Sequence, residues 1–556
     1  MIVYPKIQYF IFYTLFLEFV ISHRACGGVR DSNVTLFNSY PNKGKRMLDS
    51  SNWSPIRIYV DYYSLHQMNL SSPMLTSIKT IINQTVSVIQ TLINVQPSGF
   101  NISINSCGGI PVSPEVISGV DADLIIIPSY DNNLDDGTEA YSSICVQDSW
   151  NYRPLAGLIS FTRNIRYNEP NWLEYNTVLA LHELTHVLVF SEKLFYNFTN
   201  SDGSIKDFSD VITKQTINGV ERLMIKTPKV VAAAKKHFGC DKLIGVELEN
   251  QGGIGTMTNH WEARIMLTDY MIGVSYDETT ISDITLALLE DSGWYKTNNY
   301  TAGLFRYGKN EGCSFLNSKC IIDGKTSFPE EYCDSSTLPT CSNGRVSKGN
   351  CFFQNSDQIT TPYQYFGSTS RGGFRDSDYC PIPVAPSGSK LMEYNCKYGV
   401  DNMYPFTLEE KISNNSACFL STLVNYNYAA NLTNYIGKVK AICYQYYCDD
   451  INKGVIVNVG KINSTCQTSG GNVTFPGYSG ELYCPDYNLL CTMSSYCYSM
   501  IDCVLKKVVE KNDTYDYNYI RNHQIPTKDG IVFLTSNSNF LKVFSFISFI
   551  VIYIFI

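Results

Sequence analysis

The chain of 556 residues has few charged residues and no basic excess. Its 43 lysines and arginines are outnumbered by 51 aspartates and glutamates, which gives a formal net charge of −8. A protein that binds nucleic acid needs a basic surface to neutralise phosphates, so we expect no nucleic-acid partner. The length leaves room for two to four domains with sizeable cores.

Closely spaced cysteine pairs are absent. None of the 19 cysteines forms a Cys-x-x-Cys pair, which argues against a zinc finger or an iron–sulfur protein. Fifteen of them lie from Cys313 onward, a density typical of a disulfide-stapled region made in an oxidising compartment. Asn-x-Ser/Thr sequons along the chain fit a glycoprotein. We therefore predict a protein of the secretory pathway, located at the cell surface or outside the cell.

Both ends of the chain are hydrophobic. An apolar run after Lys6 is too short and interrupted to span a membrane, and it predicts a signal peptide over residues 1–22. Residues 540–556 end the chain without a basic flank, which favours the signal for a GPI lipid anchor. A short transmembrane tail is the alternative. In both cases the polar residues 511–539 would form a stalk and the protein would be attached to a membrane.

Histidine is scarce, with seven in the chain, yet two of them stand four apart within the apolar residues 178–190. His182, Glu183 and His186 form the pattern HExxH. On a helix, residues i and i+4 share a face, so both imidazoles could reach a single Zn²⁺. Glu183 could then act as the general base of peptide hydrolysis. A plain buried helix would explain the apolar stripe, but not the histidines and the acid inserted in it.

The extended pattern HExxHxxGxxH is missing. Val189 stands where the glycine would be, and Glu192 where the third histidine would be. We predict His260 as the third ligand, because it follows the glycine-rich residues 251–255 and precedes Met271 by eleven positions. A methionine turn beneath the metal is typical of such peptidases, whereas ordinary core packing is the alternative for Met271. If the turn at Val189 needs positive φ, a β-branched residue there is strained by about 1–3 kcal/mol.

Hydrophobic periodicity predicts an α/β sandwich in which the HExxH helix packs beneath a twisted sheet. The expected strands are residues 56–62, 101–106, 122–128 and 155–161, and the expected further helices are residues 74–95, 230–237 and 281–294. Residues 313–503 have short strands and many turns without long helical periodicity.

Residues 23–52 are polar and predict a short pro-segment, with a basic cluster at residues 43–46 as a processing site. Because nineteen is odd and the other eighteen cysteines can pair completely, Cys26 is the natural unpaired thiol. Its thiolate could cap the zinc and keep the enzyme latent. The alternative is that Cys26 is lost with the signal peptide or pairs outside the chain.

Several motifs together resemble the leishmanolysin family, the zinc metallopeptidases of protozoan surfaces. They are HExxH, His237-Phe-Gly-Cys240, the Gln-Gly-Gly before His260 and Met271, followed by residues 288–295, 308–313 and 378–381 and the later cysteines. His237 itself looks structural, beside a disulfide cysteine. The resemblance covers residues 53–503.

The resemblance implies an α+β fold with a metzincin-like catalytic domain, in which a twisted sheet lies over an active-site helix. Residues 53–190 would form its N-terminal part, residues 191–310 an inserted central domain with the third ligand and the methionine turn, and residues 311–510 a cysteine-rich, mainly β domain. It also implies one Zn²⁺ per chain. The ligands would be His182, His186 and His260, with Glu183 as base, Met271 in the turn and Cys26 as the pro-segment cysteine.

The predicted function is a zinc-dependent endopeptidase that hydrolyses extracellular or surface proteins, with a role in cell adhesion. The alternative is a catalytically weak or inactive surface glycoprotein of the same fold that acts as an adhesin. Val189 is the only direct support for that alternative.

Overall fold

The computed structural model describes residues 26–29, 34–37, 52–134, 137–167, 172–253, 255–274, 276, 278–298, 305–335, 338–356, 358–385, 394–397, 408–413, 415–427, 436–449, 451–467, 471–491 and 504. The expected signal peptide, the basic cluster at 43–46, the stalk and the C-terminal hydrophobic run lie outside these residues. Among the residues described, no helix has the length and apolar character needed to cross a membrane.

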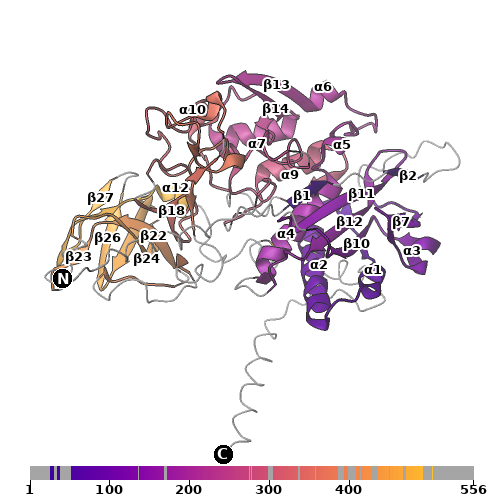
Figure 1. The fold of residues 1–556 in the computed structure, drawn as a ribbon, viewed down its shortest axis with the longest axis horizontal. Coiled ribbons are helices and arrows are strands. Elements are labelled where there is room, and N and C mark those ends of the chain that lie inside the picture. Colours follow the sequence, from indigo (N-terminus) through magenta and orange to yellow (C-terminus); the bar gives the residue numbers. More distant parts are fainter. Residues whose placement is uncertain are drawn as a thin grey trace, which may run out of the picture.

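A six-stranded sheet organises the N-terminal half (Figure 1). Strand β10 (Leu124–Asp131) runs parallel to β4 (Ile58–Val60) on one side and to β12 (Pro154–Thr162) on the other. Strand β11 (Ala140–Asp148) is antiparallel to β12. The outer edge of β11 is covered by two short parallel strands, β1 (Cys26–Val29) and β2 (Thr35–Phe37).

Both faces of this sheet are buried. Alternate residues of β10 point to opposite sides: Leu124 and Ile126 join the core shared with helices α2 (Ser72–Leu92) and α4 (Trp172–Leu188), and Ile125 and Ile127 join a second cluster. That second cluster includes side chains from the segment with β6 (Asn101–Ile102), β7 (Ser106–Cys107), β8 (Ile110–Pro111), α3 (Pro114–Ser118) and β9 (Val120–Asp121). Helix α4, which carries HExxH, thus packs under the sheet as predicted.

The close approach of α4 to the sheet depends on Gly157 in β12. A Cβ atom at this position would lie 2.3 Å from Cγ1 and 2.7 Å from Cγ2 of Val187. Real carbon atoms do not approach so closely, so only glycine lets α4 lie at this depth.

The predicted strands at 122–128 and 155–161 are confirmed as β10 and β12. The strand predicted at 56–62 is the shorter β4, which is preceded by β3 (Ser54–Pro55). The strand predicted at 101–106 is divided into β6 and β7. The predicted helix at 74–95 ends at Leu92, because the next residues form β5 (Ile93–Val95), which pairs with β16 (Tyr295–Thr297). Strand β11 was not predicted, since its buried residues include several polar ones.

The region that follows α4 contacts the N-terminal half through the pairing of β16 with β5. Its apolar residues belong to the same core as those of α2 and α4. Its elements are α5 (Glu192–Phe195), α6 (Phe208–Val211), β13 (Ile212–Ile217), β14 (Val220–Ile225), α7 (Pro228–Phe238), β15 (Val246–Glu247), α8 (Ala263–Met266) and α9 (Asp283–Asp291). The helices predicted at 230–237 and 281–294 are confirmed as α7 and α9.

The C-terminal region is mainly β, as predicted, and has a second sheet with its own apolar core (Figure 1). Its elements are α10 (Gly312–Asn317), β17 (Pro339–Cys341), β18 (Lys348–Cys351), β19 (Gln354–Asn355), η1 (Thr361–Tyr363), β20 (Arg371–Gly372), η2 (Arg375–Ser377), β21 (Pro383–Val384), β22 (Ser416–Ser421), β23 (Val424–Asn425), β24 (Lys440–Asp449), β25 (Gly454–Val459), β26 (Ile462–Cys466), β27 (Asn472–Val473), β28 (Tyr478–Ser479), β29 (Leu482–Tyr483) and α12 (Tyr487–Cys491). The sheet has the order β26-β25-β24-β22-β29-β27.

Disulfides join cysteines of the described residues in pairs. They are Cys107–Cys145, Cys240–Cys313, Cys320–Cys380, Cys333–Cys351, Cys341–Cys418, Cys396–Cys443, Cys448–Cys491 and Cys466–Cys484. Cys497 and Cys503 lie outside the described residues. The density of disulfides is typical of secreted proteins. The disulfide expected beside His237 is the Cys240–Cys313 bond.

Candidate metal centre

Helix α4 brings two histidines and an acid to the buried side of the sheet. Glu183 and His186 are fully buried, and His182 is 5% exposed. His182 and His186 are one helical turn apart, so their rings lie on the same face, and their Nε2 atoms are 2.9 Å from each other.

His260 reaches the same point from a distant part of the chain. Its backbone carbonyl accepts a hydrogen bond from Glu249 N (2.9 Å), and the next residue, Trp261, donates from its backbone N to Met271 O (3.0 Å). These bonds hold His260 between two neighbouring segments. Its Nε2 lies 3.2 Å from that of His182 and 3.1 Å from that of His186. The three histidines form a buried group of potential metal ligands.

Three backbone carbonyls fix the tautomers of these rings. The Nδ1 atom of His182 lies 2.6 Å from Tyr270 O, that of His186 lies 2.6 Å from Phe190 O, and that of His260 lies 2.7 Å from Thr256 O. A carbonyl can only accept, so each Nδ1 carries the ring proton and each Nε2 presents a lone pair. Three lone pairs that face one another repel unless a cation lies among them.

Burial keeps the rings neutral. It lowers the pKa of His182 to about 4 and that of His260 to about 3, the latter with a further contribution from His182. The pKa of His186 is lowered well below its usual value by burial and by its two histidine neighbours. Neutral imidazole is the form that binds a metal ion.

The donor set and its spacing fit zinc. Tetrahedral zinc with Zn–N bonds of about 2.0–2.1 Å places its nitrogen ligands about 3.3 Å apart. The three Nε2 separations of 2.9–3.2 Å are close to that value. The carbonyl that accepts from each Nδ1 orients its imidazole, as hydrogen-bond partners of metal-binding histidines do.

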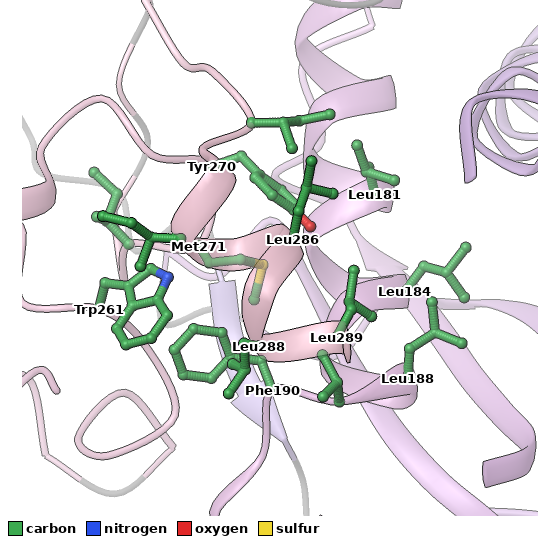
Figure 2. Packing of buried hydrophobic residues seen from close by; sticks show 14 of the residues in the cluster. Leu181, Leu184, Leu188, Phe190, Trp261, Tyr270, Met271, Leu286, Leu288 and Leu289 are labelled. Atoms are coloured by element: carbon green, nitrogen blue, oxygen red, sulfur yellow. The ribbon is translucent and has the colours of Figure 1, made fainter. Parts of the chain in front are cut away.

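Met271 is fully buried in the core, and its carbonyl accepts the hydrogen bond from the backbone N of Trp261, the residue after His260. Figure 2 shows it among Phe190, Trp261 and leucines of α4 and α9, including Leu188 and Leu286. Leucines of α9 therefore belong to the same core as Met271.

Comparison with known proteins identifies the family. The family model described as leishmanolysin, of the M8 peptidases, matches residues 73–496. The chain belongs to the leishmanolysin family. It is 30% identical over 365 residues to a leishmanolysin homolog of Crithidia fasciculata (62% of this chain, 52% of that protein). It is 27% identical over 420 residues to a leishmanolysin-like peptidase of Drosophila melanogaster (64% and 61%), and 32% identical over 220 residues to a leishmanolysin of Leishmania donovani (38% and 35%). The chain thus spans about half to three-fifths of the length of the first two relatives.

Val189 is not strained in this leishmanolysin-family chain. It is buried and follows the end of α4, and it is not among the residues with positive φ. Its backbone N donates to Thr185 O (2.8 Å), and Phe190 N donates to the same carbonyl (3.0 Å). The turn therefore accepts a β-branched residue, and the strain considered for this position does not arise.

Glu192 does not join the three histidines. Its Oε2 accepts a hydrogen bond from Thr258 Oγ1 (2.9 Å), and its backbone N donates to Asn259 Oδ1 (3.0 Å). Both partners directly precede His260. The residue that stands at the position of the third histidine thus ties the start of α5 to the segment that supplies His260.

Cys26 belongs to strand β1, whose backbone pairs with β11 in the register Cys26 to Ala140. Strand β1 also lies near α4. The expected pro-segment therefore includes backbone that covers the edge of the sheet beside the HExxH helix.

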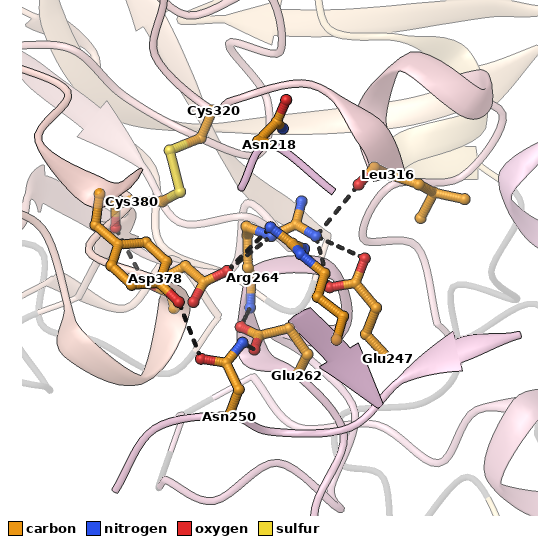
Figure 3. Close-up of polar contacts among 12 residues, drawn as sticks. Asn218, Glu247, Asn250, Glu262, Arg264, Leu316, Cys320, Asp378 and Cys380 are labelled. Atoms are coloured by element: carbon orange, nitrogen blue, oxygen red, sulfur yellow. Dashed lines mark hydrogen bonds and ion pairs between the residues drawn. A yellow bond between two sulfur atoms is a disulfide. The ribbon is translucent and has the colours of Figure 1, made fainter. Parts of the chain in front are cut away.

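A buried ionic cluster lies just beyond His260 and was not predicted (Figure 3). The guanidinium of Arg264 contacts Glu247 at 2.8 Å and Asp378 at 3.3 Å, and Arg222 pairs with the same two carboxylates. Asp378 comes from the C-terminal region, so the cluster joins that region to α8. Burial raises the pKa of the neighbouring Glu262 carboxyl well above its usual value. Asp378 begins one of the motifs that carry the resemblance, but the sequence does not reveal its arginine partners, because the cluster extends over 156 positions of the chain, from Arg222 to Asp378.

Proposed function

We propose that this protein is a zinc-dependent endopeptidase. The observation that carries the proposal is the convergence of three neutral imidazoles, each with its Nε2 lone pair directed to one point, two of them on the helix that also carries the buried Glu183. His182, His186 and His260 would hold one Zn²⁺, within a metzincin-like catalytic domain. Membership of the leishmanolysin family supports the same reaction, and protein substrates follow from it.

The residues of the chain have distinct tasks in this proposal. Zinc, when bound, would polarise the scissile carbonyl and make water more acidic. Glu183 would take a proton from the attacking water and pass it to the leaving amine nitrogen. The carbonyls of Tyr270, Phe190 and Thr256 would keep the three imidazoles oriented throughout.

The rival function, an inactive adhesin of the same fold, had its only direct support in Val189. That support is lost, because the turn at Val189 has an unstrained backbone. A role in cell adhesion through proteolysis at the cell surface stays a prediction, as do the boundaries of the three regions at 53–190, 191–310 and 311–510. So do the membrane attachment and the GPI anchor.

The latch formed by Cys26 is part of the proposal. Strand β1 covers the edge of β11 close to α4, and this position supports a pro-segment that blocks access to the site until it is cleaved. Removal of residues 23–52 is expected to start peptide cleavage. A Cys26→Ser chain is expected to be active without that removal.

Zinc content and casein cleavage of the full chain test the proposal. We expect one equivalent of zinc and cleavage that a chelator abolishes, after the pro-segment has been removed. Glu183→Ala should retain the zinc and lose cleavage. His237→Phe is the matched control, because His237 binds Tyr307 O away from the site, and it should keep both. A processed protein that holds one zinc and cleaves no peptide would refute the proposed peptidase activity.

A further inference from the structure

Asp269 is a buried carboxylate two residues before Met271, and no part of the proposed reaction uses it. It is fully buried, and within the described part of the chain no basic side chain pairs with it. Burial raises its pKa to about 6 although several hydrogen bonds act in the opposite direction. Burial of a carboxyl group destabilises the fold unless hydrogen bonds replace those that the group makes to water.

Its two oxygens bind three donors from two segments. Oδ1 accepts from Met271 N at 2.7 Å, and Oδ2 accepts from Ser282 N at 3.2 Å and from Thr285 Oγ1 at 2.9 Å. Ser282 and Thr285 form the N-terminal turn of α9, where the helix dipole favours a negative charge. Asp269 therefore joins the turn at Met271 to the start of α9.

The turn that Asp269 holds also contacts His182. Between Asp269 and Met271 stands Tyr270, whose carbonyl accepts from His182 Nδ1 at 2.6 Å. The hydroxyl of Tyr270 is also 2.9 Å from Thr185 Oγ1 on α4. A shift of this turn would therefore move the carbonyl that orients His182.

A second series of hydrogen bonds connects Asp269 to the residue after His260. Thr285 Oγ1, which donates to Asp269, accepts from the indole Nε1 of Trp261 at 2.8 Å. Trp261 follows His260 directly, and its backbone N donates to Met271 O at 3.0 Å. The carboxylate, the threonine and the indole thus fix the residue next to the third proposed ligand.

We propose that Asp269 is a positioning residue, which sets the turn at Met271 and through it the orientation of His182 and His260. The inference rests on the proposed zinc site. It assigns to one carboxylate the alignment of two ligands that are 78 positions apart in the chain. Loss of a partner that orients a metal ligand typically lowers metal affinity about 10- to 100-fold.

The test compares Asp269→Asn with Asp61→Asn in the full chain. Asp61 is a matched control, because it is also buried and accepts from two backbone N atoms, those of Tyr63 (3.1 Å) and Ser113 (2.7 Å). We measure the zinc Kd by competition with a chelator and the visible spectrum of the Co²⁺-substituted protein. Asp269→Asn should lose affinity about 10- to 100-fold and alter the Co²⁺ bands, whereas Asp61→Asn should do neither.

A second variant keeps the test decisive if Asp269→Asn does not fold. Thr285→Val retains the carboxylate and the shape of the side chain but removes the link to Trp261, and it should weaken zinc binding in the same direction by a smaller factor. Zinc affinity within twofold of the wild type and unchanged Co²⁺ bands in the folded variants would overturn the proposal. Neither readout requires peptide cleavage, so a chain that binds zinc without peptidase activity would refute the enzyme and leave this inference standing.

Discussion

Gly157→Ala should disturb the metal centre from the opposite side of α4. The new Cβ would lie 2.3 and 2.7 Å from the two γ carbons of Val187, where contacting carbons need about 3.5–4.0 Å. Rotation of Val187 does not solve the conflict, since each rotamer leaves a γ carbon in at least one of these two positions. Helix α4 must therefore move away by about 1 Å or more.

The expected magnitude follows from that displacement. Overpacking of this kind destabilises a core by about 1–3 kcal/mol. Val187 directly follows His186, so the shift also moves a proposed ligand relative to His260. Metal sites tolerate ligand displacements of about 0.2 Å, and zinc affinity should fall as well.

Urea unfolding of the metal-free protein and zinc competition measure these two effects. Val187→Ala is the matched control, because it removes both γ carbons and leaves the nearest atom, its Cβ, at 3.1 Å. Gly157→Ala combined with Val187→Ala should therefore be about 0.5–3 kcal/mol more stable than the sum of the single changes indicates. Wild-type stability and zinc affinity in Gly157→Ala alone would refute the steric reasoning.

Two further predictions concern buried ionisable groups. Arg264→Met leaves Glu247 and Asp378 with Arg222 as their remaining partner, so two buried carboxylates share one cation, and it should lower the free energy of unfolding by about 3–5 kcal/mol. Lys214→Met, in an exposed ion pair, should change it by no more than about 0.5 kcal/mol in the same urea titration. The second prediction concerns pH. Because the pKa values of His182 and His260 are about 4 and 3 in the folded chain, protons should weaken zinc binding less than about twofold between pH 7.5 and pH 5. The unfolded chain takes up protons near pH 6.5 that the folded chain does not, so the metal-free protein should lose stability as the pH falls from 6.5 toward 4. A loss of zinc affinity above about 1000-fold at pH 5 would mean that the histidines titrate as exposed groups do.

The HExxH helix could be predicted because its information is local. Two histidines at i and i+4 define one helix face whatever the rest of the fold does. His260 could be predicted for another reason, since the chain has few histidines and Met271 marks the second segment. The carbonyls that set the ring tautomers could not be predicted, because every residue has one and side-chain identity does not reveal which is placed near an imidazole.

The errors in the predicted elements have two physical origins, which are strand pairing between distant segments and the burial of polar residues. The apolar periodicity of α2 continues through Ile93 and Val95, but pairing with β16 turns these residues into a strand. Strand β11 was missed because Ser142, Ser143 and Gln147 are polar and buried, which breaks the alternation that a half-buried strand shows.

The central claim is that one zinc ion is held by His182, His186 and His260 beside Glu183. Anomalous diffraction at the zinc absorption edge from crystals of the zinc-loaded protein tests it directly. We predict one strong peak about 2.0–2.1 Å from each of the three Nε2 atoms. A peak at another set of ligands, such as one that includes Glu192 in place of His260, would contradict the account.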